Sequence, residues 1–133
     1  MEVFLGGTCA DSTWREELIP MLEVDYFNPV VDDWDEEAYQ IELEKRESCD
    51  FVLYVITPQM EGVYSIAEVV DDSNKRPNKT IFCYLVEHMD QGFEKHQIKS
   101  LDKVGKMVSD NGGIVLDNLE DVAEFLNLYE ASR

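Results

Sequence analysis

Three short segments of the sequence carry side chains that could do chemistry, and one of them holds the strongest candidate, Glu68. Glu68 follows Tyr64 by four residues, so the two side chains share a face if the segment is helical. A glutamate near a helix N-terminus is stabilised as the carboxylate, which is the form that a nucleophile needs. Alternatively, Glu68 is an exposed glutamate that only complements the helix dipole. Spacing alone favours this structural interpretation over the catalytic one. Ser65 and the loop residue Gly62 belong to the same segment.

A second segment combines acidic and aromatic side chains, because Asp32 and Asp33 directly precede Trp34. A flat indole and a hydrogen-bonding carboxylate are suited to a flat heterocycle such as a nucleobase. The alternative is a solvated acidic loop on which Trp34 packs as a lid.

The third segment, after the first apolar run, is rich in small residues and includes Gly6, Gly7 and Thr8. Glycines allow the backbone to approach a ligand closely, and the N-terminus of the helix expected next favours an anion. The segment has neither the Gly-Lys-Ser/Thr of a P-loop nor a G-x-G-x-x-G pattern. A tight turn followed by a helix cap explains it equally well.

The remaining titratable residues suggest structural roles. Glu42 and Arg46 are spaced as a helical ion pair, and such pairs lie most often on the surface. Asp71 and Asp72 follow Glu68 and are expected outside the pocket.

Metal and cofactor sites are not expected. His88 and His96 lack partner cysteines or histidines at metal-binding spacing, so we predict no metal and no cofactor. A nucleophile pair of Cys9 with His88 stays open on residue type alone.

These segments must be positioned by a regular alternation of strands and helices. Five apolar runs predict strands, and the amphipathic stretches between and after them predict helices. The expected strands are residues 3–5, 24–27, 51–57, 80–86 and 113–116. The expected helices are residues 12–21, 36–49, 64–74, 93–109 and 118–132. Strict alternation predicts a parallel sheet covered on both faces. We therefore expect residues 1–133 to form a single doubly wound α/β domain, Rossmann- or flavodoxin-like, with a five-stranded parallel sheet. Ligands bind at the carboxyl ends of such strands.

The composition narrows the possible partners. The net charge of −18 argues against binding nucleic acid or an anionic membrane surface. Solubility is the simplest explanation of that charge, and capture of a basic protein is an alternative. Three cysteines without a C-x-x-C motif fit reduced thiols in the cytoplasm. No apolar stretch reaches 18 residues, and the N-terminus lacks the basic start of a signal peptide.

Three stretches of sequence together resemble the nucleoside 2-deoxyribosyltransferase family, closest to its deoxyribosyltransferase-like branch. They are VFLGGTCADSTWRE, YFNPVVDDW and CDFVLYVITPQMEGVYSIAEVVDDSNKRPNKTIFCYL, and they fall within roughly the first 86 residues. In this family a glutamate attacks the anomeric carbon of a 2′-deoxynucleoside to form a covalent deoxyribosyl-enzyme, from which a second base or water takes the sugar.

The resemblance assigns roles to individual residues. Glu68 matches the nucleophile, and Tyr64 or Ser65 would orient it or contact the sugar. Asp33, or Asp32 in its place, would protonate or bind the leaving base. The remaining matches are Gly6, Gly7 and Thr8 on the sugar side, Trp34 stacked on the base, Gly62 in the loop, and Asp50 before the central strand.

This chain departs from the family pattern in one loop. Family members carry an aspartate before the loop glycine and the glutamate four residues after it. Here Glu61 precedes Gly62, and Glu68 comes six residues after Gly62. The resemblance also implies a homo-oligomer.

The function expected from the sequence is cleavage or exchange of the N-glycosidic bond of a 2′-deoxynucleoside or deoxynucleotide through a covalent glutamyl-deoxyribose intermediate. A module that binds a nucleotide or nucleotide derivative without cleaving it is the alternative.

Overall fold

A five-stranded parallel sheet forms the centre of the protein in a computed structural model, which describes residues 1–9 and 11–133. The strands lie in the order β2-β1-β3-β4-β7. Their bounds are β1 Glu2–Gly7, β2 Asp25–Phe27, β3 Phe51–Ile56, β4 Thr80–Tyr84 and β7 Ile114–Leu116. The chain changes direction across the sheet between β1 and β3, the point at which doubly wound folds bind ligands.

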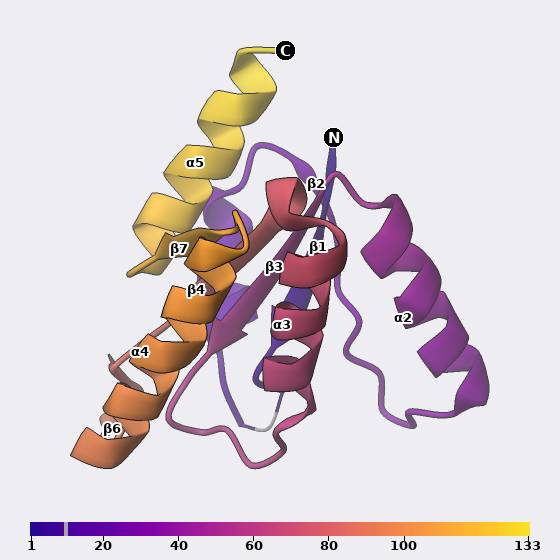
Figure 1. The fold of residues 1–133 in the computed structure, drawn as a ribbon. Coiled ribbons are helices and arrows are strands. Elements are labelled where there is room, and N and C mark those ends of the chain that lie inside the picture. The colour runs from indigo at the N-terminus through magenta and orange to yellow at the C-terminus, as the bar shows by residue number, and fades with distance from the viewer. Residues whose placement is uncertain (10) are drawn as a thin grey trace.

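The helices α1 Trp14–Leu18, α2 Glu36–Ser48, α3 Tyr64–Lys75, α4 Lys95–Asp110 and α5 Leu119–Ala131 connect and follow the strands. In Figure 1, α3 and α4 lie in front of the sheet. Their apolar side chains pack on one sheet face, whereas those of α1 and α5 belong to the separate core on the opposite face. The predicted α/β doubly wound arrangement with helices on both faces is therefore confirmed.

The central strand β3 explains why the sheet is buried on both sides. All six residues of its sequence FVLYVI are buried, as expected for a continuous apolar run between two helical layers. Val3 and Leu5 of β1 belong to one core and Phe4 belongs to the other, because successive side chains point to opposite faces.

Helix α2 is set to one side of the sheet, next to α3 (Figure 1). Asp35 caps its N-terminus by accepting a hydrogen bond from the amide of Ala38 at 2.8 Å. Its only buried residue is charged, Arg46, and the buried Cys49 follows as the C-cap. Polar contacts through Arg46 therefore connect α2 to α3.

Two predicted elements differ from the structure. The first helix is short because Pro20 cannot donate the next helical hydrogen bond, and residues Ile19–Met21 form a 3₁₀ turn. The fourth strand ends at Tyr84, and a small hairpin of β5 Glu87–His88 and β6 Gln91–Gly92 follows.

In the described part of the chain, no helix combines the length and apolar character needed to cross a bilayer.

Candidate functional site

A cavity of about 290 Å³ opens at the carboxyl ends of β1 and β3, where the strand order reverses. Its walls come from the end of β1 and the residues after it, helix α1, the loop after β2, helix α2 and the first turns of α3. The lining residues are Gly6, Gly7, Cys9, Arg15, Pro29, Val30, Val31, Trp34, Glu42, Tyr64, Ser65 and Glu68. A neighbouring cavity of about 210 Å³ shares four of these residues and adds Thr8, Ile56, Met60, Glu61 and Gly62. The two cavities form one candidate site with two compartments.

The floor of the site is the turn after β1. Gly7 has a φ of 121°, and a Cβ there would lie 2.0 Å from the carbonyl oxygen of Val55. Only glycine fits this position, because a side chain would meet both strain and a neighbouring strand. Thr8 lies beyond it, buried, and its hydroxyl accepts a hydrogen bond from the amide of Thr57 at 3.0 Å. Thr8 thus joins the loop ends of β1 and β3.

Arg15 holds the same turn from the side of α1. It is buried and donates hydrogen bonds to the carbonyl oxygens of Leu5 and Thr8 at 2.8–3.1 Å. Its guanidinium also lies 4.3 Å from the centre of the Trp14 ring. Although Arg15 lines the larger cavity, these contacts fix the backbone of the turn.

Glu68 lies in the second turn of α3 and is only 5% exposed. In the described part of the chain, no hydrogen-bond donor reaches its buried oxygen Oε2. The nearest cation is the Nη1 atom of Arg46, at 3.7 Å. A buried carboxylate oxygen without a donor is costly, and groups of this kind are concentrated at functional sites.

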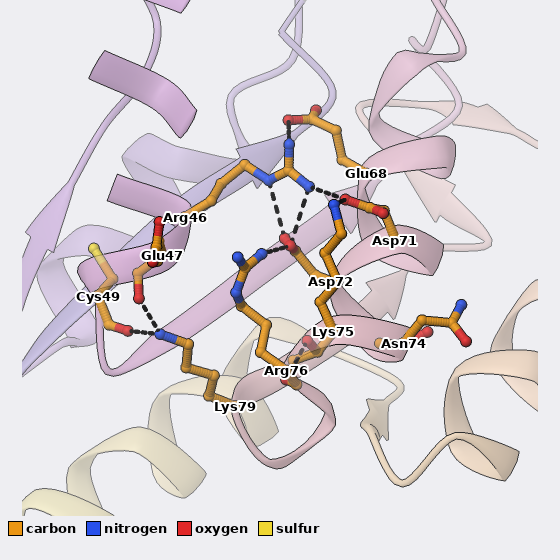
Figure 2. A network of polar contacts seen from close by, with 12 residues as sticks. Arg46, Glu47, Cys49, Glu68, Asp71, Asp72, Asn74, Lys75, Arg76 and Lys79 are labelled. Atoms are coloured by element: carbon orange, nitrogen blue, oxygen red, sulfur yellow. Dashed lines mark hydrogen bonds and ion pairs between the residues drawn. The ribbon is translucent and has the colours of Figure 1, made fainter. Parts of the chain in front are cut away.

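A buried ionic network lies next to Glu68 and contacts it through Arg46 (Figure 2). Arg46 donates from Nε and Nη2 to the carboxylate of the fully buried Asp72 at 3.1 and 3.0 Å, and from Nη2 to Asp71 at 3.0 Å. Asp72 also accepts from Arg76 and, at 2.5 Å, from the hydroxyl of Tyr54. Burial alone would lower the pKa of Arg46, but its partners raise it, so the guanidinium stays charged.

This network corrects one prediction. Arg46 was expected to form a surface pair with Glu42, yet it is buried and pairs with three carboxylates of α3. The i, i+4 spacing of Glu42 and Arg46 correctly predicts a helix. The face of the helix that carries them, however, points toward α3 and the cavity instead of solvent.

Glu42 is the residue of the site that the sequence analysis missed. It lines the cavity, and one of its oxygens, Oε2, accepts a hydrogen bond from Trp34 Nε1 at 3.0 Å. Its carboxyl group also lies close enough to that of Glu68 to shift the pKa of Glu68. Burial and the nearby carboxyl group of Glu42 raise the pKa of Glu68 from 4.5 to about 8, against the opposing effect of Arg46.

Aromatic side chains form the mouth of the site. Trp34 is 56% exposed and meets Tyr39 edge to face, with ring centres 5.3 Å apart. Tyr64 lines both cavities, and a hydrogen bond with Tyr39 raises the pKa of Tyr64 to about 12, so its phenol is neutral. Trp34, Tyr64, Ser65 and Glu68 are therefore brought together, as their positions after successive strands predicted.

Three predicted site residues lie elsewhere. Asp32 and Asp33 are exposed and do not line either cavity. Asp50 lies at the opposite, amino-terminal edge of the sheet, where it accepts a hydrogen bond from the amide of Glu2 at 2.7 Å. Its position before β3 makes it a connection between neighbouring strands, so the expected contact of Asp50 with substrate is not supported by the geometry.

The alternative pairing of Cys9 with His88 is wrong. Cys9 lines both cavities, but the ring of His88 contacts Glu17 at 2.5 Å and Gln59 at 3.2 Å. Across residues 1–9 and 11–133, no group of three or more His, Cys, Asp and Glu side chains is arranged to hold a metal ion.

Comparison with known protein families gives one match. The family model described as nucleoside 2-deoxyribosyltransferase like matches residues 1–85 of the 133-residue chain. The matched region runs from β1 through β4 and includes every residue that lines the two cavities. No curated protein matches the chain significantly.

Proposed function

The chain belongs to the nucleoside 2-deoxyribosyltransferase-like family, and from that premise we propose that it cleaves or exchanges the N-glycosidic bond of a 2′-deoxynucleoside with Glu68 as the nucleophile. One observation carries the proposal. Glu68 presents a buried carboxyl, without a donor on Oε2, to a cavity at the switch point of the sheet. The catalytic role of Glu68 also explains why an arginine is held beneath it by Asp72.

The reaction proceeds in two steps. A carboxylate oxygen of Glu68 attacks C1′ of the deoxyribose while the C1′–N bond breaks and its electron pair passes to the base. A second base or a water then attacks C1′ from the other side and releases Glu68. Two displacements at one carbon retain the configuration of the sugar.

The linings of the two compartments support an orientation of the substrate. Pro29, Val30, Val31 and Trp34 supply an apolar and aromatic wall to the larger cavity, which suits a nucleobase. The turn after β1 and the loop at Gly62 line the smaller cavity, where a backbone without bulky side chains suits the sugar. Tyr64 and Ser65 line both compartments, which supports a contact between their side chains and the sugar hydroxyls.

The charges of the site favour a substrate without a 5′-phosphate. The described residues that line the cavities include three carboxylic acids, Glu42, Glu61 and Glu68. The one arginine among them, Arg15, already donates to backbone carbonyl oxygens. A phosphate dianion would therefore enter a negative field without a free cation to neutralise it.

The proposal is tested by product analysis on a panel of deoxynucleosides and their 5′-monophosphates, with and without a second free base. A swapped nucleoside establishes transfer, free base alone establishes hydrolysis, and nucleosides are expected to have a higher kcat/KM than the phosphates. Glu68→Ala should abolish turnover, whereas Glu44→Ala, at an exposed position of α2, removes the same charge and should leave it unchanged. An inactive wild type, or a fully active Glu68→Ala, would refute the proposal.

A binding module is the second candidate, and the raised pKa of Glu68 favours it. A carboxyl with a pKa of about 8 is mostly protonated at neutral pH, which weakens a nucleophile unless substrate displaces the proton. If the panel stays unchanged at high protein concentration, calorimetry with the same compounds should find tight binding of an intact nucleoside.

A further inference from the structure

The small hairpin of β5 and β6 follows the residues that the family model matches, and it contacts the loop after β3. Its residues Met89–Gly92 are exposed, but the side chain of His88 is only 8% exposed. The ring of His88 is therefore turned inward from an exposed hairpin. What it contacts there indicates what the hairpin does.

Both ring nitrogens of His88 face oxygen atoms of other elements. Nε2 lies 2.5 Å from Oε2 of Glu17 on α1, and Nδ1 lies 3.2 Å from Oε1 of Gln59 in the loop after β3. The same oxygen of Glu17 accepts a hydrogen bond from the hydroxyl of Thr13 at 2.9 Å, which holds the carboxylate in place. A carboxylate offers only acceptors, so Nε2 needs a proton to bind it.

The orientation of the Gln59 amide is fixed by its other contacts. Its nitrogen donates to the carbonyl oxygen of His88 at 2.9 Å and to Oε1 of Gln91 at 3.1 Å. A carbonyl oxygen can only accept, so the amide nitrogen must lie on that side and the amide oxygen must face the ring. Nδ1 of His88 therefore also meets an acceptor.

Two acceptors on one ring require two N–H groups. A neutral imidazole has a single N–H, and it would leave either Gln59 or Glu17 in contact with a bare nitrogen. The imidazolium donates from both nitrogens. Protonated His88 consequently bridges α1 to the loop after β3, and loss of one proton breaks one side of the bridge.

The charged groups around the ring are acidic. Helix α1 contributes Glu17, the loop after β3 contributes Glu61 beyond its neutral amide, and the hairpin itself adds the exposed Glu87 and Asp90. Among residues 1–9 and 11–133, no lysine or arginine forms an ion pair with any of these four. The charge of protonated His88 is therefore the one that Glu17 pairs with.

The loop after β3 depends on this bridge. Within the described residues, every side-chain hydrogen bond of residues 58–63 is made by Gln59, and each goes to the hairpin. The next three residues, Met60, Glu61 and Gly62, line the smaller cavity. A Cβ at Gly62 would meet no atom within 4 Å, so this wall is loosely packed and its position follows Gln59.

From this geometry we propose that His88 is a pH-sensitive positioning residue that holds the loop 57–63 against the smaller compartment. Protonated His88 fixes Gln59, and with it the wall that Met60 and Gly62 form. Neutral His88 releases this wall as the pH rises. The ordering of the loop goes beyond the proposed function, whereas its effect on substrate binding rests on that function.

The first measurement follows the ring itself. The chain has two histidines, so nitrogen-15 NMR of the imidazoles between about pH 5 and 9 can be assigned with His96→Gln, at an exposed position of α4. At the acid end both nitrogens of His88 should carry a proton, and the amide signals of residues 58–63 should shift as the ring loses one. A single N–H at every pH, or loop signals that ignore the titration, would overturn the proposal.

Hydrogen exchange then compares variants. Protection of the loop amides, corrected for the intrinsic rate at each pH, should fall by about three- to tenfold as the pH rises in the wild type and in His96→Gln. His88→Gln should have the low protection at every pH, and so should Gln59→Ala, although its His88 still titrates. Full protection in His88→Gln would overturn the role of the ring, provided that the unfolding midpoint shows a folded variant.

Kinetics on a deoxynucleoside test the consequence for binding. KM of His88→Gln relative to wild type should be about three- to tenfold higher at low pH and should approach equality at high pH, with kcat little changed. Titration of Glu68 affects both proteins alike and cancels in this ratio. A ratio independent of pH, or a loss in kcat alone, would overturn the effect on binding. An inactive wild type would remove the proposed function, while NMR and exchange would still decide the role of His88.

Discussion

At the scale of single side chains, Asp72 is the central acceptor of the polar network next to the candidate site. It is fully buried and accepts hydrogen bonds from Arg46, Arg76 and Tyr54. Because Arg46 reaches Glu68 only while its other nitrogens are held by Asp72, the position of the nucleophile depends on a residue outside the cavity.

Removing the charge of Asp72 should therefore be severe. Asp72→Asn leaves two guanidinium groups with a weakened partner, and breaking a buried ion pair in this way costs about 3–5 kcal/mol of unfolding free energy. Asp110→Asn, in an exposed i, i+4 pair with Lys106, is the control and should change stability by less than about 0.5 kcal/mol. Urea denaturation measures both, and equal stabilities would contradict the network.

The raised pKa of Glu68 predicts a pH dependence of stability. Burial is the largest cause, Glu42 on α2 and Asp72 on α3 add to the rise, Arg46 on α2 opposes it, and the result is a pKa of about 8 instead of 4.5. A raised folded-state pKa means that the native protein holds the proton more tightly than the unfolded chain. This stabilisation is complete below pH 4.5 and is lost as the pH rises through about 8.

Glu68→Gln cannot titrate at this position, so its stability relative to wild type should rise across the same pH range. The slope is at most about 1.4 kcal/mol per pH unit. Urea denaturation of both proteins in matched buffers measures it. Parallel stability curves would show that Glu68 has an ordinary pKa in the folded protein.

At this scale the sequence predicts the site residues that follow strands, but it does not predict those on one helix that contact a neighbouring helix. Glu68, Tyr64, Ser65 and Trp34 line the cavity because carboxyl ends of parallel strands converge. Glu42 was missed because an i, i+4 pair with Arg46 has the same spacing on a solvated face and on a buried one. Only the packing of α2 against α3 distinguishes the two.

The turn after β1 shows what one element contributes to the site. Gly7 lies in a left-handed conformation directly against β3, and the next residue, Thr8, donates from its amide to Val55 at 2.9 Å. Any side chain at Gly7 would separate the two strands that form the floor of the cavity.

Gly7→Ala should consequently lower the unfolding free energy by about 3–5 kcal/mol, or prevent folding. Gly62→Ala is the matched control, since a Cβ at Gly62 meets no atom within 4 Å and should change stability by less than about 0.5 kcal/mol. Thermal unfolding followed by circular dichroism measures both. A stable Gly7→Ala protein would mean that the turn has another conformation.

The hairpin at residues 87–92 was not predictable from the usual turn residues. Met89 and Asp90 have φ values of 54° and 62°, the geometry of a tight two-residue turn that sequences normally mark with Asn-Gly or Asp-Gly. The apolar Leu85 and Val86 extended the predicted strand, although the sheet ends at Tyr84. The amide of Leu85 still donates a hydrogen bond to the carbonyl oxygen of Ile56 at 2.9 Å, so backbone pairing with β3 continues one residue beyond the end of β4.

At the scale of the whole molecule, alternation in the sequence predicted the layers of the fold but not the order of its strands. Strand order depends on which strands pair, and the apolar runs of β1, β3 and β4 are equally suited to a central position. The order β2-β1-β3-β4-β7 then explains why the site lies between β1 and β3. The expected cytoplasmic location and homo-oligomer stay predictions.

We propose that the whole chain is one domain, and this proposal predicts one cooperative unfolding transition. Trp14 lies in a core and Trp34 at the mouth of the site, so their fluorescence reports both regions. Fluorescence and far-ultraviolet circular dichroism should give coincident denaturation curves. A separate early transition in fluorescence alone would show that the site unfolds independently of the sheet.

The most direct test of the central claim is detection of the covalent deoxyribosyl-enzyme. Acid quenching during turnover of a deoxynucleoside, or of an analogue fluorinated at C2′ to slow release, should give a protein species heavier by one sugar residue, as measured by intact mass. Peptide mapping should place the added mass on Glu68, and Glu68→Gln should acquire none. Turnover without any adduct, or an adduct on another residue, would contradict the account.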